Sequence, residues 1–158
     1  MKTLKEIYRI LKPGAGFRLV LPDMDLAIKQ YEAGNKEWFE IFYEKGYEYG
    51  ENEYSIGEHF IRLFANDLIH KGIYLKQVRE DWKNLGQKKF FEKYKSKRDP
   101  LEDAKHLQWF TFEKIKKILK KIGFEKIELS QCQKSRYTEM CNDEFDVTYP
   151  VYSLYIDV

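Results

Sequence analysis

Apolar positions at the start of the chain have a helical spacing and are followed by a short continuous run. They recur at intervals of three and four residues, at Leu4, Ile7, Tyr8 and Leu11. This spacing is typical of a helix with one buried face, and Thr3 and Glu6 have the spacing of a capping box, so we expect a helix that starts at the very N-terminus. Residues 12–16, with one proline and two glycines, end the helix because the residue before a proline is pushed out of the helical region. Residues 17–21 then predict a buried strand, which Pro22 ends.

From residue 24 to about residue 110 the spacing of apolar residues stays helical, and no strand pattern competes with it. We expect one helix that Gly34 ends, a second that Asn35 caps, a third from Ser55 to Gly72 and a fourth over 75–85. This part of the sequence predicts a helical insertion or lid over 24–110.

The last third of the chain predicts one helix and two strands. Thr111 is a favourable N-cap, and the apolar stripe that follows it ends at Gly123, where a C-cap glycine belongs. Residues 125–129 and 153–158 have the patterns of strands. The sequence therefore predicts an α/β fold, organised as a single domain over 1–158.

Composition adds few constraints on function. The 28 basic and 26 acidic residues leave a net charge of +2, so any attraction to nucleic acid or an anionic membrane must be local. Cys132 and Cys141 are too few for a disulfide scaffold or a structural zinc site, and each is expected to be an ordinary small apolar side chain. The start of the chain has no signal-peptide pattern, and no apolar run is long enough to span a bilayer. We expect a cytoplasmic protein without a membrane partner.

Three segments of the sequence resemble the C-terminal half of a class I S-adenosylmethionine-dependent methyltransferase. Residues 4–23 are similar to the family's E-x-x-R-x-L-K-P-G-G segment, which ends the helix before the fifth strand; Ala15 replaces the second glycine, and Gly16 follows one position later. Residues 106–124 resemble the entry into the last helix and the Gly-Phe turn that leads into the sixth strand. Residues 153–158 resemble the seventh strand, which is antiparallel in that family.

The resemblance implies a partial Rossmann-like sheet of the fifth, sixth and seventh strands with a helical insertion. Residues 1–23 would form the helix, turn and strand of the methyltransferase core, and 111–158 the last helix and the two closing strands. The helices over 24–110 would help to select the methyl acceptor. The implied activity is methyl transfer from S-adenosylmethionine to an acceptor that the sequence does not identify.

Two features with which this family binds its cofactor have no counterpart in the sequence. They are the glycine-rich turn after the first strand and the acidic residue that ends the second strand. Gly14, Ala15 and Gly16 are no substitute because they precede a strand instead of following one. We therefore expect a fragment or subunit that does not bind S-adenosylmethionine by itself. A half-sheet exposes a strand edge, which favours a homo-oligomer or a partner chain that supplies the missing half.

Asp23 and His106 are the candidate catalytic residues. Asp23 follows the strand over 17–21, and ligands of open α/β sheets gather beyond the carboxyl ends of strands, so its carboxylate could orient a substrate or act as a base. It could also merely cap the next helix. His106 could act as acid or base because the pKa of histidine lies near neutrality, or it could pack beside Trp109.

Four aromatic residues could line a ligand pocket for the substrate or pack in the core. They are Tyr47, Tyr49, Tyr54 and Trp109. No metal site is expected, because His59 and His70 would be separated by roughly 16 Å on a single helix, too far for one ion.

A non-enzymatic interaction module and an RNA-binding module are the alternatives to a methyltransferase. The absent glycine turn favours the first. The second would use Lys88 to Arg98, within a basic segment over 83–98 that also contains Phe90, Phe91 and Tyr94. Basic groups neutralise phosphates and aromatic rings stack on bases. The segment could also be a solvated helix whose aromatic residues face inward.

Overall fold

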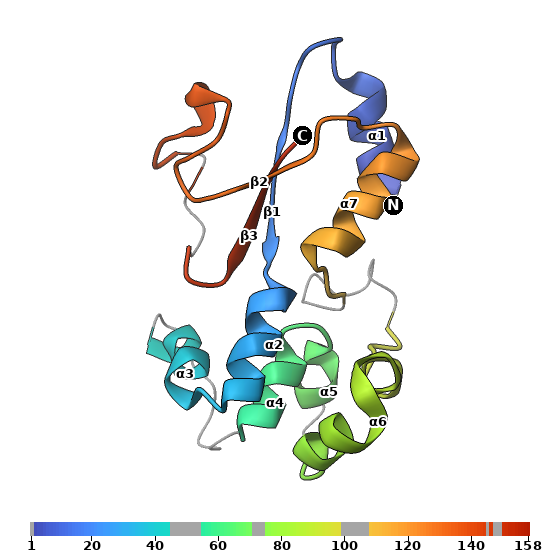
Figure 1. Ribbon diagram of the computed structural model, residues 1–158, viewed down its shortest axis with the longest axis vertical. Coiled ribbons are helices and arrows are strands. Elements are labelled where there is room, and N and C mark those ends of the chain that lie inside the picture. Colours follow the sequence, from blue (N-terminus) through green and yellow to red (C-terminus); the bar gives the residue numbers. More distant parts are fainter. Residues whose placement is uncertain (1, 45–54, 71–74, 99–107, 145, 147–149) are drawn as a thin grey trace. The chain divides into compact units, whose positions relative to one another are not determined.

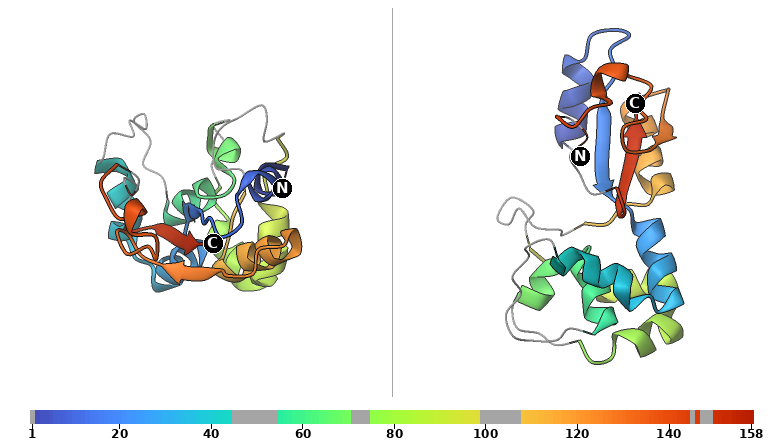
Figure 2. Two further views of the ribbon diagram at one scale, coloured as in Figure 1. Left: turned by 90° about the horizontal axis from the view of Figure 1, so that it is seen from above. Right: turned by 90° about the vertical axis from the view of Figure 1, so that its left-hand side faces the viewer.

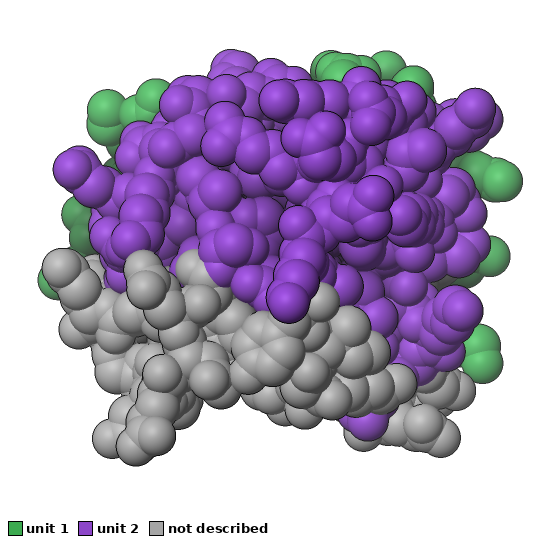
Figure 3. Space-filling view, turned by 90° about the horizontal axis from the view of Figure 1, so that it is seen from below, with its two compact units in different colours: residues 1–25, 110–158 green, residues 26–109 purple. Residues whose placement is uncertain are grey.

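The computed structural model describes residues 2–44, 55–70, 75–98, 108–144, 146 and 150–158, and the chain forms two compact units (Figures 1 and 3). Unit 1 combines residues 1–25 with residues 110–158, and unit 2 comprises residues 26–109. In the sequence, unit 2 is thus an insertion that follows the first strand of unit 1.

Unit 1 is built on a three-stranded antiparallel sheet with the strand order β1-β3-β2. β1 (Arg18–Pro22) and β2 (Glu128–Ser130) both pair with β3 (Ser153–Asp157), and Ile156 of β3 lies opposite Leu19 on one side and Leu129 on the other. Since both outer strands are antiparallel to β3, β1 and β2 run parallel to each other.

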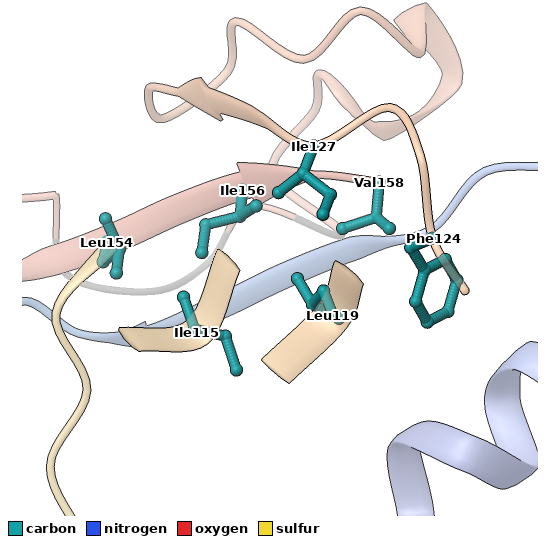
Figure 4. Packing of buried hydrophobic residues seen from close by; sticks show 7 residues of the cluster. All are labelled: Ile115, Leu119, Phe124, Ile127, Leu154, Ile156 and Val158. Carbon is teal, nitrogen blue, oxygen red and sulfur yellow. The ribbon is translucent and has the colours of Figure 1, made fainter. Parts of the chain in front are cut away.

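Two helices cover one face of this sheet, α1 (Lys2–Ile10) and α7 (Phe112–Ile122) (Figures 1 and 2). Side chains alternate between the faces of a strand, so Leu19 and Leu154 face the helices together with their neighbours two residues away. The buried cluster in Figure 4 consists of Ile115, Leu119, Phe124, Ile127, Leu154, Ile156 and Val158. The core of unit 1 therefore lies between β3 and α7, with α1 beside α7.

The described part of unit 2 is helical. Its helices are α2 (Met24–Ala33, which begins in unit 1), α3 (Lys36–Glu44), α4 (Ile56–Arg62), α5 (Asn66–His70) and α6 (Val78–Lys93). Phe60 is fully buried at the centre of an aromatic core, where its ring stacks on Tyr31 with 4.4 Å between centroids and on Phe90 with 6.0 Å. Gly86, with a φ of 70°, bends α6.

The mixed α/β class and several helix ends agree with the sequence prediction. Gly34 ends α2 with a φ of 68°, and the Asn35 side chain caps α3 by accepting a hydrogen bond from the Trp38 N–H at 3.1 Å. Thr111 caps α7 by accepting from the Lys114 N–H at 3.2 Å, and Gly123 follows the last helical residue.

α1 begins at Lys2, at the N-terminus as expected, although Thr3 then lies inside the helix and is not its N-cap. Other boundaries were wrong. The helix expected over 55–72 is divided into α4 and α5, because the N–H groups of Leu63 and Phe64 bond to carbonyls three residues back and tighten the last turn of α4. The helix expected over 75–85 begins at Val78 and continues to Lys93. The strand expected over 125–129 is Glu128–Ser130.

Candidate functional site

The carboxyl end of β1 is where three segments of unit 1 meet. The backbone N–H of Asp23 donates to the carbonyl of Tyr152 at 2.9 Å, and the Asp25 carboxylate accepts a hydrogen bond from the N–H of Phe112 at 3.2 Å. Asp23 follows the last residue of β1 and directly precedes α2. It therefore lies at the end of the strand and at the start of the helix, which are the two positions predicted for it. Its role as a substrate-orienting group or base remains a prediction.

Of the other predicted site residues, Trp109 is the one that the structure describes. Trp109 is partly buried in unit 2, where its ring stacks on Phe91 with 4.2 Å between centroids and 21° between planes. This stacking favours the packing interpretation of Trp109. The remaining predicted residues lie outside the described residues; they are His106, Tyr47, Tyr49 and Tyr54.

The described turns do not have the form that the methyltransferase family uses for its cofactor. β1 passes into α2 through Asp23 without a glycine, and β2 is followed by a short 3-10 helix, η1 (Thr138–Met140). Gly14, with a φ of 82°, lies in the turn from α1 into β1. The described turns therefore do not fit S-adenosylmethionine in the way that this family binds it.

The basic segment over 83–98 does not present its aromatic residues to solvent. Its buried aromatic residues are Phe90, Phe91 and Tyr94. Tyr94 donates a short hydrogen bond to the carboxylate of Asp81, which also binds Lys93 at 2.5 Å. An RNA interface in this segment would rest on its exposed basic side chains, without stacking from these rings.

β1 is an outer strand of the sheet, and one of its sides is an open edge among the described strands. Phe17 and Val158 exchange two backbone hydrogen bonds of 2.9 and 3.0 Å. Hydrogen-bonded and non-hydrogen-bonded pairs alternate in an antiparallel ladder, so Leu19 also bonds to β3, whereas the backbone groups of Arg18 and Val20 point away from it. No described strand pairs with this side of β1.

The sheet face opposite the helices holds a buried ion cluster centred on Arg18. Its Nε and Nη2 donate to Asp146 at 2.8 and 2.9 Å, and Nη1 donates to Asp157 at 2.6 Å. The other two donors bind Ser130 Oγ at 3.1 Å and the Gln131 carbonyl at 2.6 Å. The side chains of Arg18, Asp146 and Asp157 are 5%, 0% and 3% exposed. All five guanidinium N–H groups are thus used inside the protein.

Asp157 is held ionised in this cluster. Burial alone would raise the pKa of its carboxyl group, but hydrogen bonds from the Arg136 N–H, Arg18 and Ser135 outweigh burial and lower this pKa. The cluster ties Asp146 to the sheet, and its buried, paired groups make it structural.

The sequence contained a signal for part of this cluster that the prediction did not use. Arg18 and Asp157 are single charged residues within two otherwise mostly apolar strands. Opposite charges at such positions indicate that the two strands are neighbours, and the register places these residues opposite each other. Asp146 gives no comparable signal, because it belongs to no helix or strand.

The histidine and cysteine side chains that the structure describes are not grouped into a second site. His59 is buried in α4, while His70 belongs to α5, so the assumption of one continuous helix was wrong. Cys132 and Cys141 are free and partly buried. Within the described ranges, no three His, Cys, Asp or Glu side chains are grouped so that they could hold a metal ion, and no helix has the length and apolar character needed to cross a membrane.

Comparison of the chain with protein-family models, with curated proteins and with solved structures gave no match.

Proposed function

We propose that the chain is the C-terminal part of a class I S-adenosylmethionine-dependent methyltransferase-like unit, acting as a fragment or subunit of it. The observation that carries this proposal is the placement of the antiparallel β3 between β1 and β2. The sequence resemblance implied that 153–158 would be the antiparallel closing strand. The Lys-Pro-Gly turn before β1 and the Gly-Phe turn after α7 support the same assignment.

In this proposal the chain contributes to binding and orienting the methyl acceptor. Asp23 stands at the carboxyl end of β1, where ligands of open α/β sheets gather, and its carboxylate would accept a hydrogen bond from the N–H or O–H group that receives the methyl group. The helices of unit 2 would select the acceptor. Such an enzyme accelerates its reaction chiefly by holding two reactants in line, which requires few catalytic side chains.

The cofactor half of the site would come from strands beyond β1, because the described turns of this chain do not fit the cofactor. The open edge of β1 is where a further strand can join. The same edge also supports the second candidate function, a non-enzymatic module that binds another chain by strand pairing.

Calorimetric titration with S-adenosylmethionine tests the proposal. The chain alone, shown to be folded by its amide NMR spectrum, is expected to give no saturable heat. A complex of the chain with a polypeptide that carries the preceding strands is expected to give saturable binding and transfer of a labelled methyl group. One-to-one binding by the chain alone would place the cofactor pocket inside it. A stable complex that neither binds nor transfers would contradict the methyltransferase and leave the interaction module.

A further inference from the structure

The positive charge of the chain is concentrated in the two helices of unit 1. Residues 2–12 and 112–126, which comprise α1, α7 and the residues that follow each helix, contain ten basic and three acidic residues. The other parts of the chain together contain 18 basic and 23 acidic residues. The helices therefore carry a local excess of seven positive charges in a chain whose net charge is +2, and such a local field attracts an anionic partner.

Basic side chains form one row on each helix, on the surface turned away from the core. Lys2, Lys5 and Arg9 follow one another along α1 at spacings of three and four residues, and Lys117 and Lys121 do so along α7. All five residues are exposed, whereas the apolar residues of both helices pack against the sheet. α1 and α7 are in contact, and neighbouring helices lie about 8–10 Å apart, so the two basic rows border one continuous surface.

The basic rows reduce the stability of the helices when no anion neutralises them. Lys5 lies one turn from Lys2 and one turn from Arg9, and like charges at these spacings destabilise a helix. Glu6 accepts a hydrogen bond from Arg9 at 2.8 Å and offsets part of this repulsion. Lysine is depleted from protein–protein interfaces, so an extended phosphate backbone fits the two rows better than an acidic protein does.

An exposed aromatic ring lies beside the basic row of α1. Tyr8 is three residues after Lys5 and is 46% exposed, and its ring packs edge-on against Phe124 with 4.8 Å between centroids. Phe124 follows the end of α7, so Tyr8 lies on the side of α1 that faces α7. Proteins that bind single-stranded nucleic acid combine basic groups that track the phosphates with aromatic rings on which bases stack. The aromatic residues of the basic segment over 83–98 are buried and do not offer this combination.

An anionic membrane fits this surface less well. A helix that lies on a bilayer buries a free apolar face among the lipids. The apolar faces of α1 and α7 are already used, because Leu4 and Ile7 pack against the buried cluster that contains Ile115 and Leu119. Ile10 is 61% exposed, but one isoleucine does not make an apolar face.

We propose that the outer surface of α1 and α7 binds single-stranded nucleic acid, with phosphates along the two basic rows and a base stacked on Tyr8. The inference goes beyond the proposed function, since it requires neither the cofactor nor a methyl acceptor. The phosphate backbone and the bases are common to RNA and DNA, so both serve as probes.

Fluorescence anisotropy with a labelled single-stranded RNA of about 20 nucleotides, and with DNA of the same sequence, tests the proposal. We expect saturable binding whose affinity falls about a hundredfold when the salt concentration is raised fourfold, as for about five neutralised phosphates. Equal binding of RNA and DNA would show that phosphates and bases suffice, and a preference for RNA would add the 2′-hydroxyl to the contacts.

Two changes separate the phosphate contacts from stacking. Lys5→Glu combined with Lys117→Glu should weaken binding about tenfold or more and make the salt dependence less steep, because two phosphate contacts are lost. Tyr8→Leu should weaken binding about fivefold to a hundredfold and leave the salt dependence unchanged, because stacking releases no counterions. Tyr8→Phe keeps the ring and should bind as the wild type does.

Lys88→Glu combined with Lys89→Glu is the matched control, since it makes the same change of charge at two exposed lysines of α6. This variant should bind nearly as the wild type does, and amide spectra would verify that all variants are folded. The proposal would be overturned by a folded wild-type chain without saturable binding at low salt, or by equal affinities of the two double variants. Binding to phosphatidylserine vesicles but to neither oligonucleotide would also overturn it, in favour of a membrane surface. None of these results depends on methyl transfer.

Discussion

Replacing Arg18 with methionine should sharply destabilise unit 1. The substitution keeps most of the apolar stem but removes a guanidinium group with five hydrogen bonds, leaving the buried carboxylates of Asp146 and Asp157 without their counter-charge. Removing one partner of a buried ion pair costs about 3–5 kcal/mol. Since Arg18 is 5% exposed and both carboxylates are almost fully buried, we expect the free energy of unfolding of unit 1 to fall by that amount.

The measurement has to report on unit 1. All three tryptophans, Trp38, Trp82 and Trp109, lie in unit 2, so their fluorescence would follow the other unit. Urea unfolding monitored through the backbone amide signals of β3 reports directly on the sheet. Arg9→Met is the control, because Arg9 pairs with Glu6 on the surface with both side chains more than half exposed. It should leave the unfolding midpoint of unit 1 unchanged.

A triple variant tests whether the loss of stability in Arg18→Met comes from the unpaired carboxylates. Arg18→Met combined with Asp146→Asn and Asp157→Asn removes all three charges, and replacement of a whole buried ion cluster by neutral groups is much less costly than removal of one member. We therefore expect the triple variant to be more stable than Arg18→Met alone. The reasoning would be refuted by an Arg18→Met variant no less stable than Arg9→Met, or by a triple variant less stable than the single one.

Two further predictions concern acid and packing. Because the folded-state pKa of Asp157 lies below its unfolded value, its stabilisation is present above the unfolded pKa of about 3.9 and is lost as the pH falls through the folded value. The free energy of unfolding of unit 1, measured with urea, should decrease as the pH is lowered below about 4, and it should decrease less steeply for Asp157→Asn. Equal pH dependence in the two proteins would contradict this. In unit 2, alanine at Gly57 would place a Cβ 2.9 Å from the Cβ of Val78. Gly57→Ala should therefore destabilise unit 2 by about 1–3 kcal/mol in tryptophan-monitored unfolding, although Gly→Ala usually stabilises a helix; a stabilised variant would contradict the close packing.

The elements that the sequence predicted best are those with a local signal at each end. α7 has a capping threonine, a regular apolar stripe and a glycine with positive φ, all within residues 111–123. α2 and α3 are separated by Gly34 and Asn35. The positive φ of Gly34 ends α2, and the side chain of Asn35 caps α3. Each signal acts over a few residues, so contacts with the rest of the folded protein do not change the helix end that it predicts.

The errors occur where contacts distant in the sequence decide the outcome. Phe124 and Ile127 are buried in the core of unit 1, yet the strand begins only at Glu128, because β3 sets where the ladder starts. Thr3 and Glu6 have capping spacing, but the capping box in the described structure is Ser55 with Glu58, where the serine hydroxyl accepts from the Glu58 N–H. A spacing of three residues is common, and only the start of a helix makes it a cap.

The ion cluster and the open edge of β1 are consequences of one alternation. In an antiparallel ladder the side chains and the backbone groups both alternate with a period of two, so at Arg18 the side chain is directed to one face of the sheet while the N–H and carbonyl are directed along the sheet. The side chain is committed to Asp146 and Asp157, while the N–H and carbonyl remain directed at the edge. The cluster therefore holds the strand that presents the edge without occupying the edge itself. The one charged side chain of β1 is thus directed to the sheet face opposite the helices, and Pro22 is the residue of this strand that has no N–H to offer at the edge.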